Sequence, residues 1–221
     1  MKDDLKELAK QLGNPEGETG IEVANMMNAT NIGMTKHAIE SLNLSSNDCV
    51  LELGHGNCGH LSYLMKQAEN LKYFGLEISE LMQQEAIKSN QNYIENNSAN
   101  FRLYNGTEIP FDDESFDKIF TVNTLYFWQN PDLLLNEIYR VLKPNGILAL
   151  TFADKSFMEK LPFTNFGFNL YSLKDAEELL KKNRFKILNS ISQTEQVFSK
   201  TNEMVNRTFF TVVVKNLKIT F

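Results

Sequence analysis

The chain has few cysteines, few prolines and no long apolar stretch. Two cysteines in 221 residues are too few for a disulfide scaffold, and without an export signal we expect both to stay reduced. The densest apolar stretch, residues 146–153, is far shorter than the roughly 18 residues of a membrane helix, so no membrane span is expected. The first eight residues carry too many charges for the apolar core of a signal peptide. These absences together predict a cytoplasmic protein.

An excess of positive charge is also absent. The chain carries 22 Lys and Arg against 28 Asp and Glu, a formal net charge of −6 and a pI near 5.2. No general basic field therefore attracts nucleic acid or anionic lipid, and we expect no nucleic-acid partner. Hydrophobic residues at 42% and charged residues at 23% are typical of a globular protein. The sequence leaves the oligomeric state open.

Strand and helix patterns alternate along most of the chain. Short apolar strands are predicted at residues 49–53, 72–76, 100–104, 116–122, 147–152, 185–191 and 207–214. Helical spacing predicts helices between them at residues 60–70, 79–96, 131–142 and 172–183. This order is typical of an α/β fold with a doubly wound, Rossmann-like sheet covered on both faces. Residues 1–45, with helical spacing at 1–12 and 21–42, are predicted to form an N-terminal helical cap or lid on a domain at 46–221.

A glycine-rich turn follows the first predicted strand. Gly54–Gly59 fits G-x-G-x-x-G between a strand and a helix, where glycines permit a tight turn and close approach of a ligand. Glu77 ends the next predicted strand, where a carboxylate can accept hydrogen bonds from ribose hydroxyls. The pattern predicts a nucleotide-containing cofactor. The alternative is a turn that only joins strand to helix, with Glu77 a solvated strand end.

Glu52 indicates which kind of cofactor binds. It lies two residues before Gly54, where dinucleotide-binding folds usually carry an apolar residue. A carboxylate there repels a pyrophosphate, whereas it attracts a cofactor that carries an ammonium and a sulfonium.

Four ordered segments then resemble motifs of the class I S-adenosylmethionine-dependent methyltransferases. Residues 50–56 (Val-Leu-Glu-Leu-Gly-His-Gly) resemble motif I, and residues 73–79 resemble the second-strand motif. Residues 105–117 are similar to the adenine loop and the strand behind it, and residues 140–146 to the helix-to-strand turn. The resemblance implies a seven-stranded, mostly parallel sheet with an antiparallel late strand, and S-adenosylmethionine as the cofactor. Met27-Asn28 and residues 33–35 further resemble the ubiquinone/menaquinone-biosynthesis C-methyltransferase group.

The resemblance also implies which residues contact the cofactor. Glu52 and the first two glycines would contact the methionine half, Glu77 the ribose and Ile78 the adenine, while the His55 ring is expected to point outward. The implied set is Glu52, Gly54, His55, Gly56, Glu77, Ile78, Asn105, Gly106, Thr107, Asn123, Thr124 and Leu125.

The chain departs from the family pattern at two positions. Cys58 stands where the third glycine is usual, and the glycine follows one place later at Gly59. Asn105 stands where the family commonly has an acidic residue, although its carbonyl oxygen can still accept a bond from the adenine amine.

No residue identifies itself as a general base, and Tyr126 and His37 are the only candidates. The aromatic residues of 126–128 and of 157–171 are read as core by default, with a wall of the acceptor pocket as the other interpretation. The three histidines, His37, His55 and His60, show no metal-ligand spacing, so no metal is predicted.

The predicted function is transfer of a methyl group from S-adenosylmethionine to a small, partly apolar organic acceptor by in-line displacement. One alternative is an NAD(P)-dependent oxidoreductase with the same glycine pattern. Another is a cofactor-binding protein without transfer activity, because a fold does not guarantee chemistry.

Overall fold

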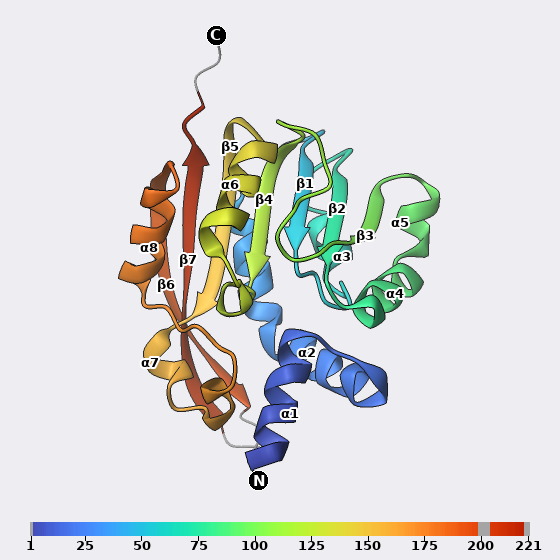
Figure 1. Cartoon of the computed structure of the whole chain (residues 1–221). Coiled ribbons are helices and arrows are strands. Elements are labelled where there is room, and N and C mark those ends of the chain that lie inside the picture. Colours follow the sequence, from blue (N-terminus) through green and yellow to red (C-terminus); the bar gives the residue numbers. More distant parts are fainter. Residues whose placement is uncertain (1, 199–203, 219–221) are drawn as a thin grey trace.

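A seven-stranded sheet forms the centre of the computed structural model, which describes residues 2–198 and 204–218 (Figure 1). Its order is β3-β2-β1-β4-β5-β7-β6. The strands are β1 (Cys49–Leu53), β2 (Lys72–Glu77), β3 (Ala99–Leu103), β4 (Phe116–Val122), β5 (Leu142–Ala153), β6 (Phe185–Phe198) and β7 (Met204–Asn216). Strands β1 to β5 are parallel, and β7 pairs antiparallel with both β5 and β6. The predicted Rossmann-like, mostly parallel sheet is confirmed.

Helices connect the strands and cover both faces of the sheet. They are α1 (Lys2–Gly13), α2 (Gly17–Ser41), α3 (Leu61–Leu64), α4 (Glu80–Ser89), α5 (Gln91–Glu95), α6 (Pro131–Val141), α7 (Lys155–Met158) and α8 (Leu173–Lys182), with short 3₁₀ turns η1 (Leu125–Phe127) and η2 (Pro162–Asn165). Leu135 of α6 and Leu180 of α8 belong to the larger core cluster, whereas Ile39 of α2 and Leu61 of α3 belong to the second. The strands between these clusters are therefore buried on both sides.

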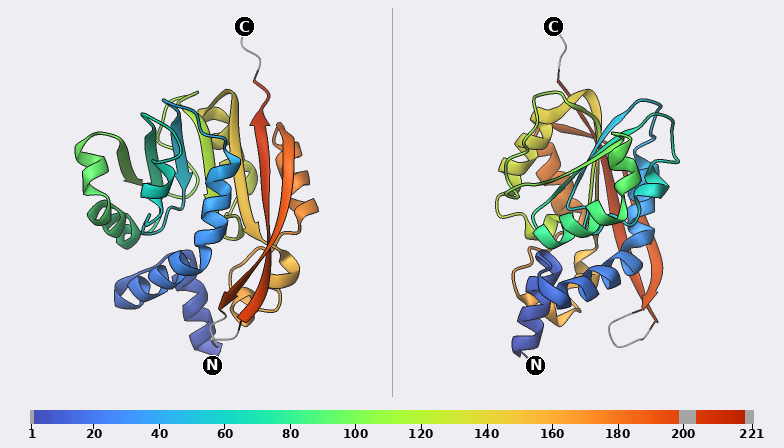
Figure 2. Two further views of the ribbon diagram at one scale, coloured as in Figure 1. Left: turned by 180° about the vertical axis from the view of Figure 1, so that it is seen from behind. Right: turned by 90° about the vertical axis from the view of Figure 1, so that its right-hand side faces the viewer.

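The N-terminal helices lie at the end of the sheet to which the parallel strands point. In Figure 1 the arrowheads of β1 and β4 are directed toward α1 and the first half of α2. Helix α2 bends, so that its first half lies beside α1 and its second half runs along one face of the sheet (Figure 2). One helix thus belongs both to the core and to the end of the sheet where ligands of this fold bind.

The helix predicted at residues 60–70 is much shorter in the structure. Only Leu61–Leu64 is α-helical. The amides of Lys66 and Gln67 bond to carbonyls three residues back, at Tyr63 and Leu64, which tightens the last turn and ends the helix.

The helix predicted at residues 79–96 begins as expected but is interrupted. Ser79 accepts a bond from the Met82 amide as an N-cap. Asn90, which is buried, leaves the helical conformation, and its side chain donates to the carbonyls of Ala86 (2.9 Å) and Cys58 (3.3 Å). The interruption between α4 and α5 therefore ties the end of α4 to the glycine-rich turn.

The last two strands are longer than predicted. They extend well beyond residues 185–191 and 207–214 and pair with each other over nearly their whole length. Among the described residues, no helix combines the length and the apolar content needed to cross a bilayer.

Candidate functional site

A cavity of about 480 Å³ lies where β1, β2, β3 and β4 end. The turns after these strands form its floor, and α1 and α2 close it from the other side. Its lining comprises Leu12, Gly13, Pro15, Ala24, Met27, Asn28, Asn31, Thr35, Glu52, Gly54, His55, Gly56, Asn57, His60, Glu77, Ile78, Met82, Tyr104, Asn105, Gly106, Thr107, Val122, Asn123, Thr124, Phe127, Trp128 and Gln129. All residues predicted to contact a cofactor line this cavity except Leu125, which is fully buried in the core.

The first two glycines of the turn occupy positions that a side chain would disturb. Gly54 has φ +73°, and a Cβ there would lie 2.4 Å from Cγ2 of Thr124. Gly56 has φ +56° with open space around the place of a Cβ. Gly54 thus allows the turns after β1 and β4 to touch, and Gly56 leaves bare backbone toward the cavity.

The third position of the turn explains the shifted glycine. Cys58 has φ +50°, a conformation that costs a residue other than glycine roughly 1–3 kcal/mol, and its side chain is completely buried. Gly59, in contrast, lies directly against α2. A Cβ at position 59 would be 2.9 Å from Nδ2 of Asn28. The glycine at position 59 therefore makes room for the covering helix.

Glu77 is not the solvated strand end of the alternative interpretation. It is 6% exposed, and its Oε2 accepts a bond from the Gly56 amide at 2.9 Å. Its Oε1 accepts bonds from the amides of Ile78 (2.8 Å) and Ser79 (3.2 Å). A carboxylate has about four acceptor positions, so these three bonds leave one position for a ligand. Glu77 thus connects β2 to the glycine-rich turn and also lines the cavity.

Glu52 lies within a buried polar cluster. Its Oε2 accepts bonds from His60 Nε2 at 2.8 Å and from the Tyr73 hydroxyl at 2.5 Å. Cys58 Sγ lies 3.2 Å from the same hydroxyl and 4.0 Å from His60 Nε2. Burial lowers the pKa of His60, but Glu52 and Cys58 beside it together outweigh burial and raise that pKa well above its ordinary value. Glu52 and His60 therefore form a buried ion pair beside the cavity.

The ring of His55 does not point outward as expected. It is 4% exposed, covers Gly75 and meets the ring of Phe101 at a centroid distance of 5.1 Å. Its Nδ1 lies 2.7 Å from the Gly56 carbonyl, which can only accept, so Nδ1 carries the proton. Burial lowers the pKa of His55, so the ring is neutral and its Nε2 is a buried acceptor without a partner among the described residues.

Asn105 shapes its own loop. Its Oδ1 accepts bonds from the amides of Thr107 and Glu108 and from the Thr107 hydroxyl, at 2.8–2.9 Å. The oxygen expected to meet an adenine amine is thus already occupied. The side chain of Ile78, which is 41% exposed, stays available as an apolar surface at the cavity edge.

The two candidates for a general base lie outside the cavity lining. Tyr126 is 2% exposed, and its hydroxyl bonds to the backbone of Ala153 and to Asn123 Oδ1. Nδ1 of His37 lies 3.0 Å from the Thr211 hydroxyl, and burial lowers the pKa of this ring. Both side chains therefore bond to neighbouring residues of the fold and do not line the cavity, although Tyr126 contacts the lining residue Asn123.

The aromatic residues divide into a lining group and a supporting group. Phe127 and Trp128 line the cavity, and Trp128 Nε1 donates to the Thr124 hydroxyl at 3.1 Å. Phe168 packs behind them, 4.6 Å from Phe127 between ring centroids. None of residues 154–171, all of which the structure describes, lines the cavity. The structure therefore agrees with the default interpretation of this segment as core, and not with a wall of the acceptor pocket.

Several lining residues were not assigned to the cofactor site from the sequence. Asn28 and Asn31 come from α2, where only the methionines and the weak family resemblance drew attention to this region. From the sequence, His60 is named only among the histidines without metal-ligand spacing. Its position eight residues after Glu52, across the glycine-rich turn, is the signal that could have indicated a pair.

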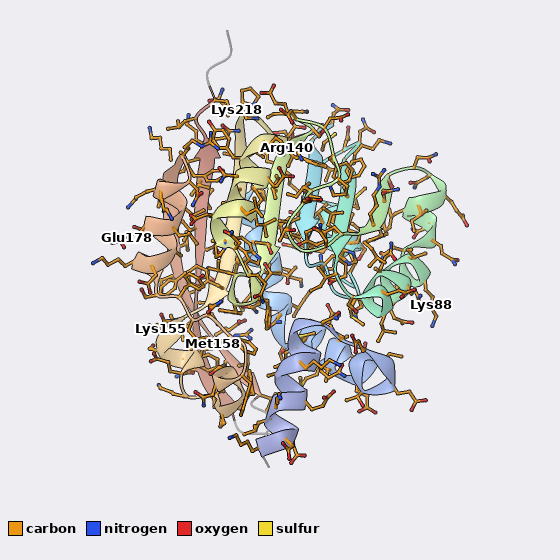
Figure 3. The ribbon with its side chains drawn as sticks, in the orientation of Figure 1. Lys88, Arg140, Lys155, Met158, Glu178 and Lys218 are labelled. Carbon is orange, nitrogen blue, oxygen red and sulfur yellow. The ribbon has the colours of Figure 1, made fainter. Side chains whose placement is uncertain are left out.

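The charged groups of the described lining are two glutamates and one histidine, His60, which is paired with Glu52, so the lining keeps a net negative charge. Among the described residues, Glu52 and Glu77 line the cavity, and neither lysine nor arginine does. Figure 3 shows labelled charged side chains such as Lys88 and Glu178 at the outside of the molecule, directed away from the sheet. The lining therefore suits a ligand with positive charge better than a pyrophosphate.

Three groups that can ligate metals also converge here. Ligand atoms of Glu52, Cys58 and His60 lie within 4.8 Å of one another, although the sequence spacing suggested no metal site. In the structure, the hydrogen bond from His60 to Glu52 already joins two of these groups.

The cavity fits S-adenosylmethionine on its own features. Two carboxylates face a space with bare backbone at Gly56 and an apolar edge at Ile78. Sheet order, glycine-rich turn and the carboxylate after β2 together match the Rossmann-like fold of the class I methyltransferases.

Comparisons with known proteins agree with that class. Residues 51–150 match the family model described as a methyltransferase domain. The YrhH protein of Bacillus subtilis (strain 168), named as a methyltransferase, is 30% identical over 110 residues, which cover 49% of this chain and 59% of that protein. The matched region thus spans about three fifths of that relative.

Solved structures show the same fold. The methyltransferase in complex with the Trm112 activator from Haloferax volcanii superposes with a TM-score of 0.74 at 18% identity, covering 88% of this chain and 94% of the other. A SAM-dependent methyltransferase from Aquifex aeolicus superposes with a TM-score of 0.66 at 21% identity, covering 94% of this chain and 96% of the other. These findings support a methyltransferase with S-adenosylmethionine as cofactor over a nicotinamide-dependent oxidoreductase.

Proposed function

We propose that this protein transfers a methyl group from S-adenosylmethionine to a small organic acceptor. The observation that carries the proposal is the charge of the cavity, whose described lining holds two glutamates and no lysine or arginine. A ligand with an ammonium and a sulfonium suits these charges, whereas the pyrophosphate of NAD or NADP would be repelled.

The proposed binding residues divide along the ends of the strands. Glu52 and the glycine-rich turn hold the methionine half, and the free acceptor position of Glu77 takes a ribose hydroxyl. Ile78, Gly106 and Thr107 border the adenine, and the role of Asn105 is to hold that loop in shape.

The reacting end of the cavity lies, in this proposal, between the turn after β4 and the covering helices. Asn123, Thr124, Phe127, Asn31 and Met27 surround it, and none of them ionises near neutral pH. The bound cofactor supplies a methyl group on a sulfonium that is already a good leaving group. These residues then need to align the acceptor with the methyl and exclude water. Because this part of the cavity offers no general base, we expect an acceptor atom that is nucleophilic without deprotonation by the protein.

The chemical class of the acceptor follows from the same wall. Apolar side chains with a few amide and hydroxyl groups suit an uncharged, partly apolar molecule. The narrower assignment to the ubiquinone/menaquinone C-methyltransferase group rests only on Met27-Asn28 and residues 33–35, and it stays a prediction.

A labelling experiment tests the proposal. The protein is incubated with methyl-labelled S-adenosylmethionine and a fractionated cell extract that contains small molecules, protein and nucleic acid. We expect label to appear in the small-molecule fraction, and the Glu77→Ala variant to reduce it strongly. Label that enters only protein or nucleic acid would contradict the proposed acceptor class. Binding of the cofactor without any transfer would favour the alternative of a cofactor-binding protein.

A further inference from the structure

The carboxylate of Glu52 is held by one of its two oxygens. Both hydrogen bonds to this carboxylate, from His60 Nε2 (2.8 Å) and from the Tyr73 hydroxyl (2.5 Å), reach Oε2. The other oxygen, Oε1, receives no hydrogen bond from the described residues, and Glu52 lines the cavity. The carboxylate therefore has a fixed side and a side left for a ligand.

The neighbours on the fixed side are themselves rigid. Glu52, His60 and Tyr73 are 2%, 6% and 0% exposed. Tyr73 lies on β2 next to Val50 of β1, and its ring packs against Phe101 at 5.7 Å between centroids. The completely buried thiol of Cys58 fills the remaining space at 3.2 Å from the Tyr73 hydroxyl, despite the unfavourable backbone conformation of Cys58. Such packing prevents the carboxylate from turning.

The pair also changes the charge that a ligand meets. A lone buried carboxylate would attract the ammonium of an amino acid and repel its carboxylate. A protonated His60 beside Glu52 removes the net negative charge, while Oε1 stays a strong acceptor. The pair therefore suits a zwitterion, such as the amino-acid end of S-adenosylmethionine, better than a simple cation.

We infer that His60 and Tyr73 are positioning residues, which fix Oε2 of Glu52 so that Oε1 binds the ammonium of a zwitterionic amino-acid group. This inference rests on the proposed function and adds specificity to it. Because His60 and Tyr73 act through Glu52, substitutions of these two residues should weaken binding only of ligands that carry the amino-acid half.

Two ligands separate this role from a general structural one. S-adenosylhomocysteine carries the amino-acid half, and 5′-methylthioadenosine carries the adenosine without it. Titration calorimetry on Tyr73→Phe, which removes one hydroxyl and keeps the ring, should show about ten-fold weaker binding of S-adenosylhomocysteine and unchanged binding of 5′-methylthioadenosine. His60→Gln should show the same selective loss. Tyr139→Phe is the matched control, because Tyr139 packs on Phe185 away from the cavity.

A double variant tests the coupling through Glu52. In a Glu52→Gln background, Tyr73→Phe should cause no further loss of S-adenosylhomocysteine affinity. Equal losses for both ligands, or no loss for S-adenosylhomocysteine, would overturn the inference and leave the proposed function intact. Failure of the wild-type protein to bind S-adenosylhomocysteine would overturn both.

A titration with a chelator tests whether a metal ion bound by Glu52, Cys58 and His60 holds the carboxylate instead of the hydrogen bonds. The wild-type affinity for S-adenosylhomocysteine should be the same with and without EDTA. If the affinity falls with EDTA and returns with Zn²⁺, a metal ion rather than the hydrogen bonds holds the carboxylate, and the inference is wrong.

Discussion

At the scale of single residues, the two carboxylates of the cavity differ in what already binds them. Glu52 is held by side chains and keeps one oxygen without a protein partner, whereas Glu77 is held by three backbone amides. Glu77 therefore stabilises the glycine-rich turn and also contributes to the proposed binding of the ligand. Substitutions of the two glutamates should have different consequences for stability.

We predict that Glu77→Ala weakens binding of S-adenosylhomocysteine by about ten-fold or more and also lowers the melting temperature. The variant loses a charged acceptor for the ribose and leaves three backbone amides without theirs. Glu77→Gln should lie between alanine and wild type, because its single oxygen replaces only part of these bonds. Calorimetry and thermal melting measure both effects. Unchanged affinity with unchanged melting would mean that Glu77 has neither role.

The His60–Glu52 pair makes a second residue-scale prediction, for the dependence of stability on pH. The folded-state pKa of His60 is raised above the ordinary 6.5, so its stabilising contribution is complete below that pH and is lost as the pH rises through the raised value. The wild-type protein should therefore exceed His60→Gln in free energy of unfolding most clearly below pH 6.5, and the difference should shrink as the pH rises through the raised pKa. Denaturant unfolding at several pH values measures this difference.

The contribution of His37 to stability should depend on pH in the opposite direction to that of His60. Burial lowers the pKa of His37, so any contribution of this ring is lost as the pH falls through the window below 6.5. A difference between wild type and His60→Gln that stays constant across the pH range would contradict a charged pair.

At the scale of elements, the bend of α2 determines how the cavity is covered. Arg207 of β7 is 7% exposed; it donates to the Thr30 carbonyl (2.6 Å), to Asn31 Oδ1 (2.9 Å) and to Glu195 of β6 (2.6 Å). Glu195 lies against Gly33, where a Cβ would be 2.2 Å from its Oε2. The hairpin of β6 and β7 therefore holds the middle of α2, next to the cavity residue Asn31.

We predict that Arg207→Met destabilises the fold by about 3 kcal/mol and impairs methyl transfer more than cofactor binding. The variant leaves Glu195 without its partner and frees the first half of α2, which carries the cavity residues Met27 and Asn28. Arg184→Met is the control, because Arg184 is exposed and lies over Tyr139 on α6. Equal losses of stability in both variants would show that Arg207 does not hold the helix.

The N-terminal segment makes a further prediction at this scale. Deleting residues 1–30 should abolish transfer and leave measurable affinity for S-adenosylhomocysteine. The deletion removes Leu12, Pro15, Met27 and Asn28 from the cavity wall and keeps the glutamates and the glycine-rich turn. The hydrogen bond from the Ser79 hydroxyl to the Pro15 carbonyl (2.6 Å) is also lost, which should weaken the affinity. Full activity of the shortened protein would show that residues 1–45 are not a lid.

At the scale of the whole molecule, the predicted features are those that depend on local sequence. Apolar periodicity located the strands, and the glycine-rich turn with Glu52 and Glu77 located the cavity, because each pattern lies within a short segment. The contact of Asn90 with Cys58 and the contact of α2 with Arg207 join residues that lie far apart in the sequence, so the sequence alone does not predict them. The sequence shows the pair of Glu52 and His60 only as a spacing of eight residues across the turn, and the folded turn brings the two side chains into contact.

The charge of the cavity is the property that separates the two enzyme classes considered for this sequence. Calorimetric titration of the full chain with S-adenosylhomocysteine and, separately, with NAD and NADP measures which of these cofactors the cavity binds. We predict saturable heat with S-adenosylhomocysteine and none with either nicotinamide cofactor, because two glutamates and no lysine or arginine line the described cavity. Saturable binding of NAD or NADP, with no binding of S-adenosylhomocysteine, would contradict the assignment of this site to a methyltransferase.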